Sequence, residues 1–579
     1  MRSNVALAAI CLLGLGLRLW GIAFGLPDVH HPDEMTILNT SLSFAKGDLS
    51  PHLFLYPTLY YYALFVWEGL FFAAGRLFGL FQSVSDFERS FFLDPSRLVL
   101  AGRTLTALFG VATLPAVHAF GARLYGRAVG LGAALFLAVA PFAVRDAHYI
   151  KHDVPVTLFI VLAQLGAARL VVDSAAASRR RGWLFAGAMA GLAMSTHYYA
   201  FLVVVPILAA AIGRVRGEGE LRPVLVQLVW AGVAAIAAFA VTSPFFFREL
   251  GVVVRDMTAV REIDIDRAVN GRGAFQYFGT YVRMLWSDAV GWPVCLAAGI
   301  GVVIALMRDW RRGLLLASFP VAFLLFLSNT VPMTRYMNAM LPSIAVAAAF
   351  AINDLGGRFT KNVKRPPRSF FFLAAAVPAL LLSLRADEFY RQKDTRTLAR
   401  EFIEQTVAAG SSILVQPHSV QLPQTRDGLL EALRAHLGSE TGAAIKFQKQ
   451  LKALADAPDN RPRFRTVYLG ETTDGGFDPD KIYVSPAVFT AAAGLQPLRD
   501  ARVAYVAVNQ YNIGHPAFDP LQAALVREGR LLATFSPYRA EVSPDRRAAV
   551  APFFHNTADR IDPALERPGP TIEIWRVKQ

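Results

Sequence analysis

Cysteine is nearly absent from this chain of 579 residues, which contains only Cys11 and Cys295. Both lie within apolar segments, so the sequence offers no disulfide framework and no thiol-based metal site. It also lacks a phosphate-binding glycine loop, a zinc-ligand spacing, an internal repeat and a low-complexity segment. These absences argue against a P-loop nucleotide enzyme, a zinc protein and a repeat array.

Apolar residues are abundant instead, at 54% of the chain, with a mean hydropathy of +0.38. Soluble domains usually fall short of these values, so the composition predicts a polytopic membrane protein. The formal net charge of +14 would suit a nucleic-acid partner. Much of the excess Lys and Arg, however, lies in short loops between apolar segments, as in cytoplasmic membrane loops. We therefore attribute the excess positive charge to cytoplasmic loops of a membrane protein and expect no nucleic-acid partner.

Eleven membrane spans are predicted. Residues 183–213 form one apolar run that is too long for a single span and is broken at Ser195-Thr196-His197, so they are interpreted as a hairpin with His197 at its tip. The first span is not interpreted as a cleaved signal, because Arg18 and Trp20 interrupt it and no small-residue cleavage site follows. The other nine apolar stretches are 4–25, 98–120, 126–144, 154–172, 223–242, 291–307, 313–328, 335–353 and 369–385.

Basic loops set the orientation of these spans. If the loops rich in Lys and Arg are cytoplasmic, the N-terminus is inside and the C-terminus outside. Residues 56–80, which are apolar but contain Glu68 and Arg76, must then lie along the outer surface without crossing. The alternative, a span over 56–80, would place Arg179-Arg180-Arg181 outside. The basic loops contain Arg123 and Arg127; Arg179 to Arg181; Arg214, Arg216 and Arg222; Arg308, Arg311 and Arg312; and Arg358 to Arg368.

From about residue 386 the apolar runs shorten. Strand-like runs at 412–415, 466–469, 503–508, 531–535 and 571–577 alternate with helical patterns, notably 397–407, 427–437 and 519–528. We predict a transmembrane domain over 1–385 and an extracytoplasmic α/β domain over 386–579, periplasmic in a Gram-negative cell. The external loop at 243–290 has mixed charge and is either a lid or a solvated loop.

Polar residues that are costly at a bilayer edge gather on the predicted outer face. The run His30-His31-Pro32-Asp33-Glu34 directly follows the first span, and two adjacent carboxylates beside two imidazoles are expensive there unless they have a function. The second external loop runs from Arg145 to Asp153 and contains Lys151. The hairpin tip bears His197, and Arg335 opens the tenth span.

These residues suit one class of reaction. A carboxylate accepts the proton of an acceptor hydroxyl or amine as the new bond forms. A departing phosphate needs fixed positive charge, and Arg binds phosphate with two parallel hydrogen bonds. The pattern therefore predicts transfer of a group from an anionic, membrane-held donor to a nucleophile. The available cations are Arg145, Lys151, Arg335 and, when protonated, His197.

Several motifs follow one another in an order that resembles a known group of enzymes. They are Leu17-Arg18-Leu19-Trp20-Gly21 with His31-Pro32-Asp33-Glu34, Tyr56-Pro57-Thr58-Leu59-Tyr60-Tyr61-Tyr62, Ser96-Arg97-Leu98 to Arg103, Asp153, Gly191-Leu192-Ala193 to His197-Tyr198-Tyr199, and Arg335-Tyr336 with Pro342. Together they resemble the GT-C superfamily of glycosyltransferases. The closest match is glycosyltransferase family 39, which includes the protein O-mannosyltransferases, and lipid A aminoarabinose transferases look similar too. Residues 386–579 are only loosely similar to the C-terminal regions of some members.

The resemblance implies inverting transfer of a hexosyl or pentosyl group from a polyprenyl-phosphate donor to an extracytoplasmic lipid, glycan or protein. By this analogy Asp33 is the general base or orients the acceptor, Glu34 is its neighbour, and Asp153 orients the acceptor or a bound cation. His197 stands where the family usually has Lys. A divalent cation is left open, and no metal ligand is assigned. The residues that would hold the donor phosphate are Lys151, His197, Arg335 and Arg145.

The same residues have simpler interpretations. Asp33 and Asp153 could cap helices, and the cations at span ends could extend to lipid headgroups. The histidines of the outer face could form a metal cluster, although no fixed ligand spacing links them. A transporter or flippase of a lipid-linked sugar is the alternative function, but it would place ionisable residues near the middle of the membrane. A scaffold with a partner-binding C-terminal domain would leave the Asp33 and Asp153 loops unexplained.

Overall fold

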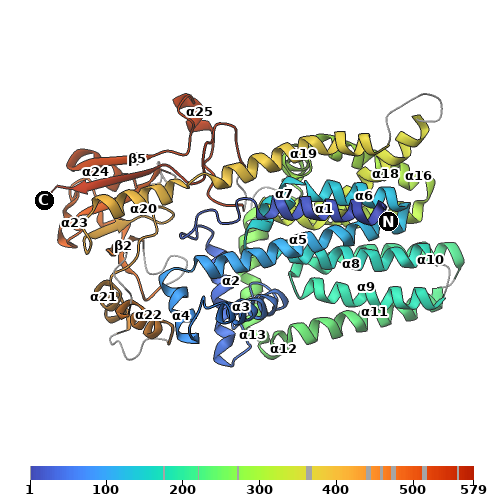
Figure 1. Cartoon of the computed structure of the whole chain (residues 1–579), viewed down its shortest axis with the longest axis horizontal. Helices are drawn as coiled ribbons and strands as arrows, with labels where there is room; N and C mark the ends of the chain where they lie inside the picture. The colour runs from blue at the N-terminus through green and yellow to red at the C-terminus, as the bar shows by residue number, and fades with distance from the viewer. Residues whose placement is uncertain are drawn as a thin grey trace.

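The computed structural model describes the chain except for residues 1, 174–175, 220, 270–272, 360–367, 438–444, 457–460, 471–477, 511–517, 557–559 and 579. Long helices lie side by side in a bundle, and the chain ends in a sheet with flanking helices at one end of that bundle (Figure 1). α19 (Arg368–Arg391) and α20 (Thr395–Thr406) lead from the bundle to the sheet.

An apolar helix occupies each stretch that was predicted to span the membrane. Within the described ranges, seven helices are long and apolar enough to cross a membrane, or eight if the bent pair α6 and α7 counts as one span. The total of eleven stays a prediction. The bundle helices are α1 (Arg2–Leu19), α5 (Ser96–Tyr125), α6 (Arg127–Ala138), α8 (Asp153–Val172), α9 (Ala176–Met194), α10 (Val204–Glu218), α11 (Leu221–Thr242), α16 (Trp292–Arg308), α17 (Trp310–Leu327), α18 (Leu341–Phe359) and α19.

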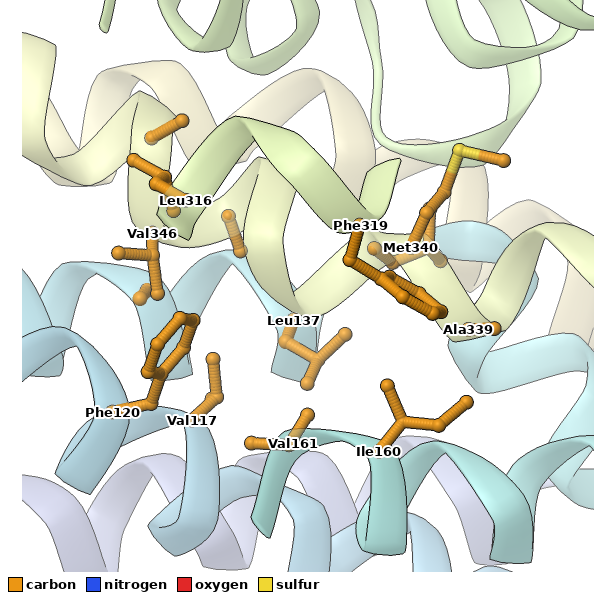
Figure 2. Close-up of a cluster of buried hydrophobic side chains, with 14 of the residues drawn as sticks. Val117, Phe120, Leu137, Ile160, Val161, Leu316, Phe319, Ala339, Met340 and Val346 are labelled. Atoms are coloured by element: carbon orange, nitrogen blue, oxygen red, sulfur yellow. The ribbon is translucent and has the colours of Figure 1, made fainter. Parts of the chain in front are cut away.

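The core of the bundle is a cluster of buried apolar side chains, part of which Figure 2 shows. Buried members shown there are Val117, Phe120, Leu137, Ile160, Val161, Leu316, Phe319 and Val346. Lipid tails are as apolar as these side chains, so close packing rather than the hydrophobic effect must hold membrane helices together. α9 and α11 approach closely at Gly187 and Gly191, where an added Cβ would lie only 2.0 Å from Ala231 O and 2.1 Å from Ala235 O.

The longer α3 and several short helices gather at the end of the bundle that faces the sheet, where α2, α3, α4, α12 and α13 are seen in Figure 1. The predicted surface segment 56–80 contains α3, and the loop 243–290 is mostly helical rather than an open loop. These elements are α2 (Pro32–Ser43), η1 (Phe44–Lys46), α3 (Leu59–Leu77), α4 (Val84–Leu93), α7 (Pro141–Arg145), η2 (Asp146–His148), η3 (Tyr198–Val203), α12 (Pro244–Arg248), α13 (Leu250–Arg261), η4 (Glu262–Asp266), α14 (Arg267–Val269), α15 (Phe278–Met284), η5 (Leu285–Ala289) and η6 (Thr334–Met340).

The sheet has six strands in the order β3-β2-β1-β4-β6-β5. β1 to β4 are parallel, and β6 runs antiparallel to both β4 and β5. The strands are β1 (Ser412–Val415), β2 (Arg465–Leu469), β3 (Ile482–Val484), β4 (Tyr505–Asn509), β5 (Gly529–Phe535) and β6 (Ile572–Val577). The helices of this part, after α20, are α21 (Arg426–Leu437), α22 (Ile445–Ala455), η8 (Pro486–Val488), α23 (Gln496–Asp500), α24 (Asp519–Glu528) and α25 (Pro544–Ala549).

Both faces of the sheet are covered. Because successive strand residues point to opposite faces, Ile413 and Leu414 belong to different buried clusters. Ile413 packs in the cluster that contains Ile403 of α20, whereas Leu414 packs in the cluster that contains Leu521 of α24. The part of the chain around the sheet therefore has a core separate from that of the helix bundle.

Candidate functional site

The start of α2 separates the two adjacent carboxylates. His31 caps the helix, and its Nδ1 accepts a hydrogen bond of 3.2 Å from the Asp33 backbone N–H. Pro32 occupies the first helical turn, where its missing N–H costs nothing. Successive residues of a helix point about 100° apart. As a result, the Asp33 side chain is 36% exposed whereas Glu34 is completely buried.

Glu34 points into the protein and forms hydrogen bonds with buried groups there. Its two oxygens accept hydrogen bonds of 2.9 Å from Arg103 Nε and Nη2, and the Ile150 backbone N–H donates a third bond of 3.0 Å. Arg103 also donates to the carbonyls of Ile22 and Phe24, and its side chain has no exposed surface. These contacts connect α2 with α5, with the loop before α8 and with the segment that follows α1. They favour a positioning role for Glu34, and its catalytic role stays a prediction.

Asp33 forms an ion pair with Lys151. The Lys151 side chain is buried and also donates a hydrogen bond of 3.2 Å to the Tyr56 hydroxyl. Burial by itself would raise the pKa of the Asp33 carboxyl, but Lys151, His31 and Arg335 outweigh it and hold that pKa well below its usual range. Asp33 is therefore an ionised carboxylate at every physiological pH. Its cationic partner comes from the loop that ends at Asp153.

Asp153 and Arg335 form a second pair beside the first. Asp153 begins α8, is 1% exposed, and lies 3.6 Å from Arg335 Nε. The Tyr199 hydroxyl also donates a hydrogen bond of 3.4 Å to Asp153. The structure thus places two predicted carboxylates, each with a predicted cation, at the same end of the bundle.

Aromatic rings fill the space between these two pairs. The Tyr56 ring stacks on His152 at 4.2 Å and meets His197 edge-on at 5.2 Å, and His197 stacks on Tyr199 at 3.7 Å. Burial, together with the charge of Lys151, lowers the pKa of both imidazoles, so they are neutral. Within the described part of the chain, neither imidazole has a hydrogen-bond partner. Each can donate one hydrogen bond to a ligand but adds no charge.

Arg145 lies apart from the Asp33 and Lys151 pair. Its Nε binds Asp146 at 3.0 Å, and its Nη2 donates to the Thr334 hydroxyl at 2.6 Å and to the Asn556 carbonyl at 3.4 Å. The guanidinium also lies over the Phe142 ring. Arg145 therefore joins the loop before α8 to the segment before Arg335, and its role in phosphate binding stays a prediction.

Three neighbours of the site were not identified from the sequence. Tyr56 contacts Lys151 and both neutral histidines, and its motif was quoted without a role. Asp264, from a π-helical turn, accepts a hydrogen bond of 2.8 Å from the Tyr336 hydroxyl. His555, from the chain after α25, lies 4.7 Å from the His31 ring. A π-helical turn often marks a functional site, but no sequence signal reveals one.

A divalent cation at the site would meet carboxylates that already have cationic partners. Among the residues that the structure describes, no group of three or more His, Cys, Asp and Glu side chains is arranged to hold a metal ion. Asp33 and Asp153 each already pair with a cation of the protein. A divalent ion would have to compete with Lys151 and Arg335 for these carboxylates.

A known protein family matches a stretch of the chain that contains part of this site. The family described as dolichyl-phosphate-mannose-protein mannosyltransferase matches residues 97–246. This range contains Lys151, Asp153 and His197, and it ends before Arg335. A search of the curated proteins returned no match.

Solved structures share the fold over most of the chain. ArnT from Cupriavidus metallidurans in the apo state is 14% identical with a TM-score of 0.51, over 89% of this chain and 94% of that one. The apo oligosaccharyltransferase of Archaeoglobus fulgidus is 11% identical with a TM-score of 0.52, over 99% and 88%. AglB of the same archaeon, solved with an inhibitory peptide and a dolichol-phosphate, is 13% identical with a TM-score of 0.50, over 93% and 73%. At these identities the likeness concerns the fold.

Proposed function

We propose that this chain, which has the GT-C fold and resembles glycosyltransferase family 39, is an integral-membrane glycosyltransferase that uses a polyprenyl-phosphate sugar as donor and an extracytoplasmic acceptor. One observation supports this proposal most directly. The Asp33–Lys151 and Asp153–Arg335 pairs, joined through Tyr56, His197 and Tyr199, form one continuous group at the end of a membrane bundle.

The comparisons and the charges together support a lipid-linked phosphate donor. One structural neighbour was solved with a dolichol-phosphate, and the matching family is described by a dolichyl-phosphate sugar. A phosphate held at the bilayer surface would meet Lys151 and Arg335. Neutral His152 and His197 would each add one hydrogen bond. The Lys usual in the family would supply a full charge at position 197, so this chain relies more on its other cations.

The transfer step uses the carboxylate that is partly exposed. The acceptor oxygen or nitrogen attacks the anomeric carbon, and its proton passes to the Asp33 carboxylate. The bond between the anomeric carbon and the phosphate oxygen breaks, and its electron pair leaves with the polyprenyl phosphate. Lys151 and Arg335 stabilise the negative charge that develops there. This single displacement inverts the configuration of the sugar.

Lys151 connects donor binding with the basicity of Asp33. While Lys151 pairs with Asp33, the carboxylate is a weak base, because its pKa is held far below the usual range. A donor phosphate competes for the same ammonium group. We infer that the pKa of Asp33 rises as Lys151 turns to the phosphate, so that the base gains strength when the donor is bound.

Mass spectrometry of envelope lipids and glycans tests the proposal. Cells that lack the chain should accumulate a polyprenyl-phosphate sugar, and Asp33→Asn at normal expression should fail to reverse this. Asp48→Asn is the matched control, because Asp48 is an exposed carboxylate of the same external loop that pairs with His52. Normal glycan product in the Asp33→Asn strain would refute the proposal. Accumulation of the donor on the cytoplasmic leaflet alone would indicate a flippase instead.

Binding of undecaprenyl phosphate to the purified full chain tests the donor site. Lys151→Met removes one charge-assisted hydrogen bond, worth about 1.5–3 kcal/mol, and should raise the Kd by about 10- to 100-fold. Lys46→Met is the control, because Lys46 is an exposed cation of the first external loop. Equal affinities for the two variants would exclude Lys151 from phosphate binding.

A further inference from the structure

The segment of residues 28–31 leads directly into α2 and is held by the part of the chain around the sheet. This α/β part comprises α20, the six strands and the helices between them. Three of its side chains bind the segment: Thr397 and Arg400 of α20, and Gln421 from the loop after β1. Their partners in the segment lie 369, 372 and 392 positions away along the chain. The contacts therefore depend on how the α/β part docks against the bundle.

Asp28 fixes the start of this segment to α20. Its side chain is buried, and its Oδ2 accepts hydrogen bonds of 3.0 Å from the Thr397 hydroxyl and 2.9 Å from Arg400 Nε. Arg400 is in turn held by Glu404, one turn further along α20, through a hydrogen bond of 2.7 Å. Because hydrogen bonds between charged groups are short and strong, α20 sets the position of Asp28.

Gln421 fixes the next residue of the segment through its main chain. Its Oε1 accepts a hydrogen bond of 3.2 Å from the Val29 N–H, and its Nε2 donates one of 2.8 Å to the Val29 carbonyl. The side-chain amide thus exchanges two hydrogen bonds with one residue, as a hydrogen-bonded partner does in an antiparallel sheet. The Val29 main chain is therefore held directly by the α/β part.

The segment connects these contacts with Asp33. His31, two residues after Val29, is buried and caps α2, and its Nδ1 accepts a hydrogen bond of 3.2 Å from the Asp33 N–H. On the other side, Glu34 ties α2 to the bundle, and Lys151 pairs with the Asp33 carboxylate. The start of α2 is therefore fixed from two sides, by the bundle and by the α/β part.

We propose that Gln421 and Asp28 are positioning residues for the transfer step, through which the α/β part holds the start of α2 where the Asp33 carboxylate meets the acceptor. This inference rests on the proposed glycosyltransferase function. It gives the α/β part a role in the reaction that needs no contact with either substrate. A shift of about 1 Å in a reacting group can slow a reaction about 100-fold. Loosening these contacts should therefore slow transfer, whereas Lys151 and Arg335 should still bind the donor phosphate.

Gln421→Ala removes both bonds to Val29 from an exposed position, and Gln424→Ala is its matched control. Gln424 makes the same two kinds of bond, to the N–H and the carbonyl of Thr466 on β2, within the α/β part. Transfer is measured in cells as the ratio of glycan product to accumulated lipid-linked sugar. Donor binding is measured as the Kd of the purified full chain for undecaprenyl phosphate. Gln421→Ala should lower transfer about tenfold or more with less than a twofold change in Kd, and Gln424→Ala should leave both within about twofold.

Hydrogen exchange followed by mass spectrometry tests the physical basis of this effect. In Gln421→Ala, a peptide that covers residues 28–36 should exchange faster, because the Val29 N–H loses its acceptor and the start of α2 loosens. Peptides from β1 and β4 should exchange as they do in the unmodified chain. Faster exchange throughout the α/β part would indicate general destabilisation and would overturn the inference.

Two substitutions of Asp28 give an independent test. Both of its donors bind the same oxygen, so an amide in its place can still accept both bonds, whereas alanine accepts neither. Asp28→Asn should keep at least about a third of normal transfer, and Asp28→Ala should lose about tenfold or more while the Kd for undecaprenyl phosphate stays within about twofold. Equal losses of transfer in the two variants would overturn the positioning role of Asp28.

Each remaining result decides a separate point. Equal transfer by Gln421→Ala and Gln424→Ala would overturn the inference, and so would a parallel loss of transfer and undecaprenyl phosphate affinity in Gln421→Ala. The proposed function itself fails if the unmodified chain does not bind undecaprenyl phosphate and its deletion causes no accumulation of lipid-linked sugar. Normal donor binding by the unmodified chain, with a Gln421→Ala variant as active as the control, would refute only the positioning role.

Discussion

Replacing Glu34 with Gln should destabilise the protein far more than replacing an exposed carboxylate. Both Glu34 oxygens bind Arg103 at 2.9 Å, and neither side chain has exposed surface. An amide presents only one oxygen to the guanidinium, so part of the buried Arg103 would lose its partner. Breaking a buried ion pair from one side costs about 3–5 kcal/mol, and we expect a loss of that size.

A double-mutant cycle measures this pair. Unfolding free energies in mixed micelles, obtained by titration with a denaturing detergent, would be compared for Glu34→Gln, Arg103→Met and the double variant. The double variant should lose less than the sum of the two single losses, because it leaves no unpaired buried charge. Glu88→Gln is the control, since Glu88 pairs with Lys449 on the surface and such a pair is worth about 0–1 kcal/mol.

The cycle also separates a positioning role from a catalytic one. If Glu34 only holds α2 in place, stability and transfer fall together, and transfer by surviving folded protein is reduced rather than abolished. A Glu34→Gln variant within about 1 kcal/mol of the unmodified protein, or strictly additive losses in the cycle, would refute the structural reasoning. Abolished transfer with unchanged stability would instead assign Glu34 to the chemistry.

The remaining predictions concern acid stability and helix packing. Burial and the nearby Arg396 lower the pKa of His30 to about 3. Below pH 6.5 this imidazole is therefore protonated in the unfolded chain, whereas in the folded chain it stays neutral down to about pH 3. As the pH falls to 5, His30 alone should therefore cost about 2 kcal/mol of stability, and His30→Gln should reduce the total loss by about that amount; equal pH 5 losses in both proteins would contradict it. Gly187→Leu should lower the unfolding midpoint, because a Cβ there would lie 2.0 Å from Ala231 O, whereas Gly232→Leu, with open space around it, should not. Similar midpoints for the two glycine variants would show that α9 and α11 are not packed closely.

Apolar run length predicts the long elements well because it depends on local composition. A helix occupies every predicted span, and strands β1, β2, β4, β5 and β6 overlap the five strand-like runs. β3 (Ile482–Val484) was missed, since three residues are too few to show a period of two. The amphipathic α4 (Val84–Leu93) was also missed, because it lies in a loop that was interpreted only from its apolar half.

The site is only partly predictable for a different reason. The predicted number of spans between Asp33, Lys151 and Arg335 places all three on the same side of the membrane. The structure brings them together. No local pattern could pair Glu34 with Arg103, which lies 69 positions away. Nor could any pattern place His555 beside His31, because that contact depends on how the α/β part docks against the bundle.

The two adjacent carboxylates at the start of α2 illustrate how one short run serves two purposes. A helix N-terminus favours negative charge, so both positions suit an acidic residue. The angle between successive helical residues then sends one side chain inward and leaves the other partly exposed. Glu34 ties α2 to Arg103 and Ile150, which fixes where the Asp33 carboxylate stands relative to Lys151. The buried member thereby sets the geometry on which the exposed member depends, and a substitution at Glu34 should reduce transfer through Asp33.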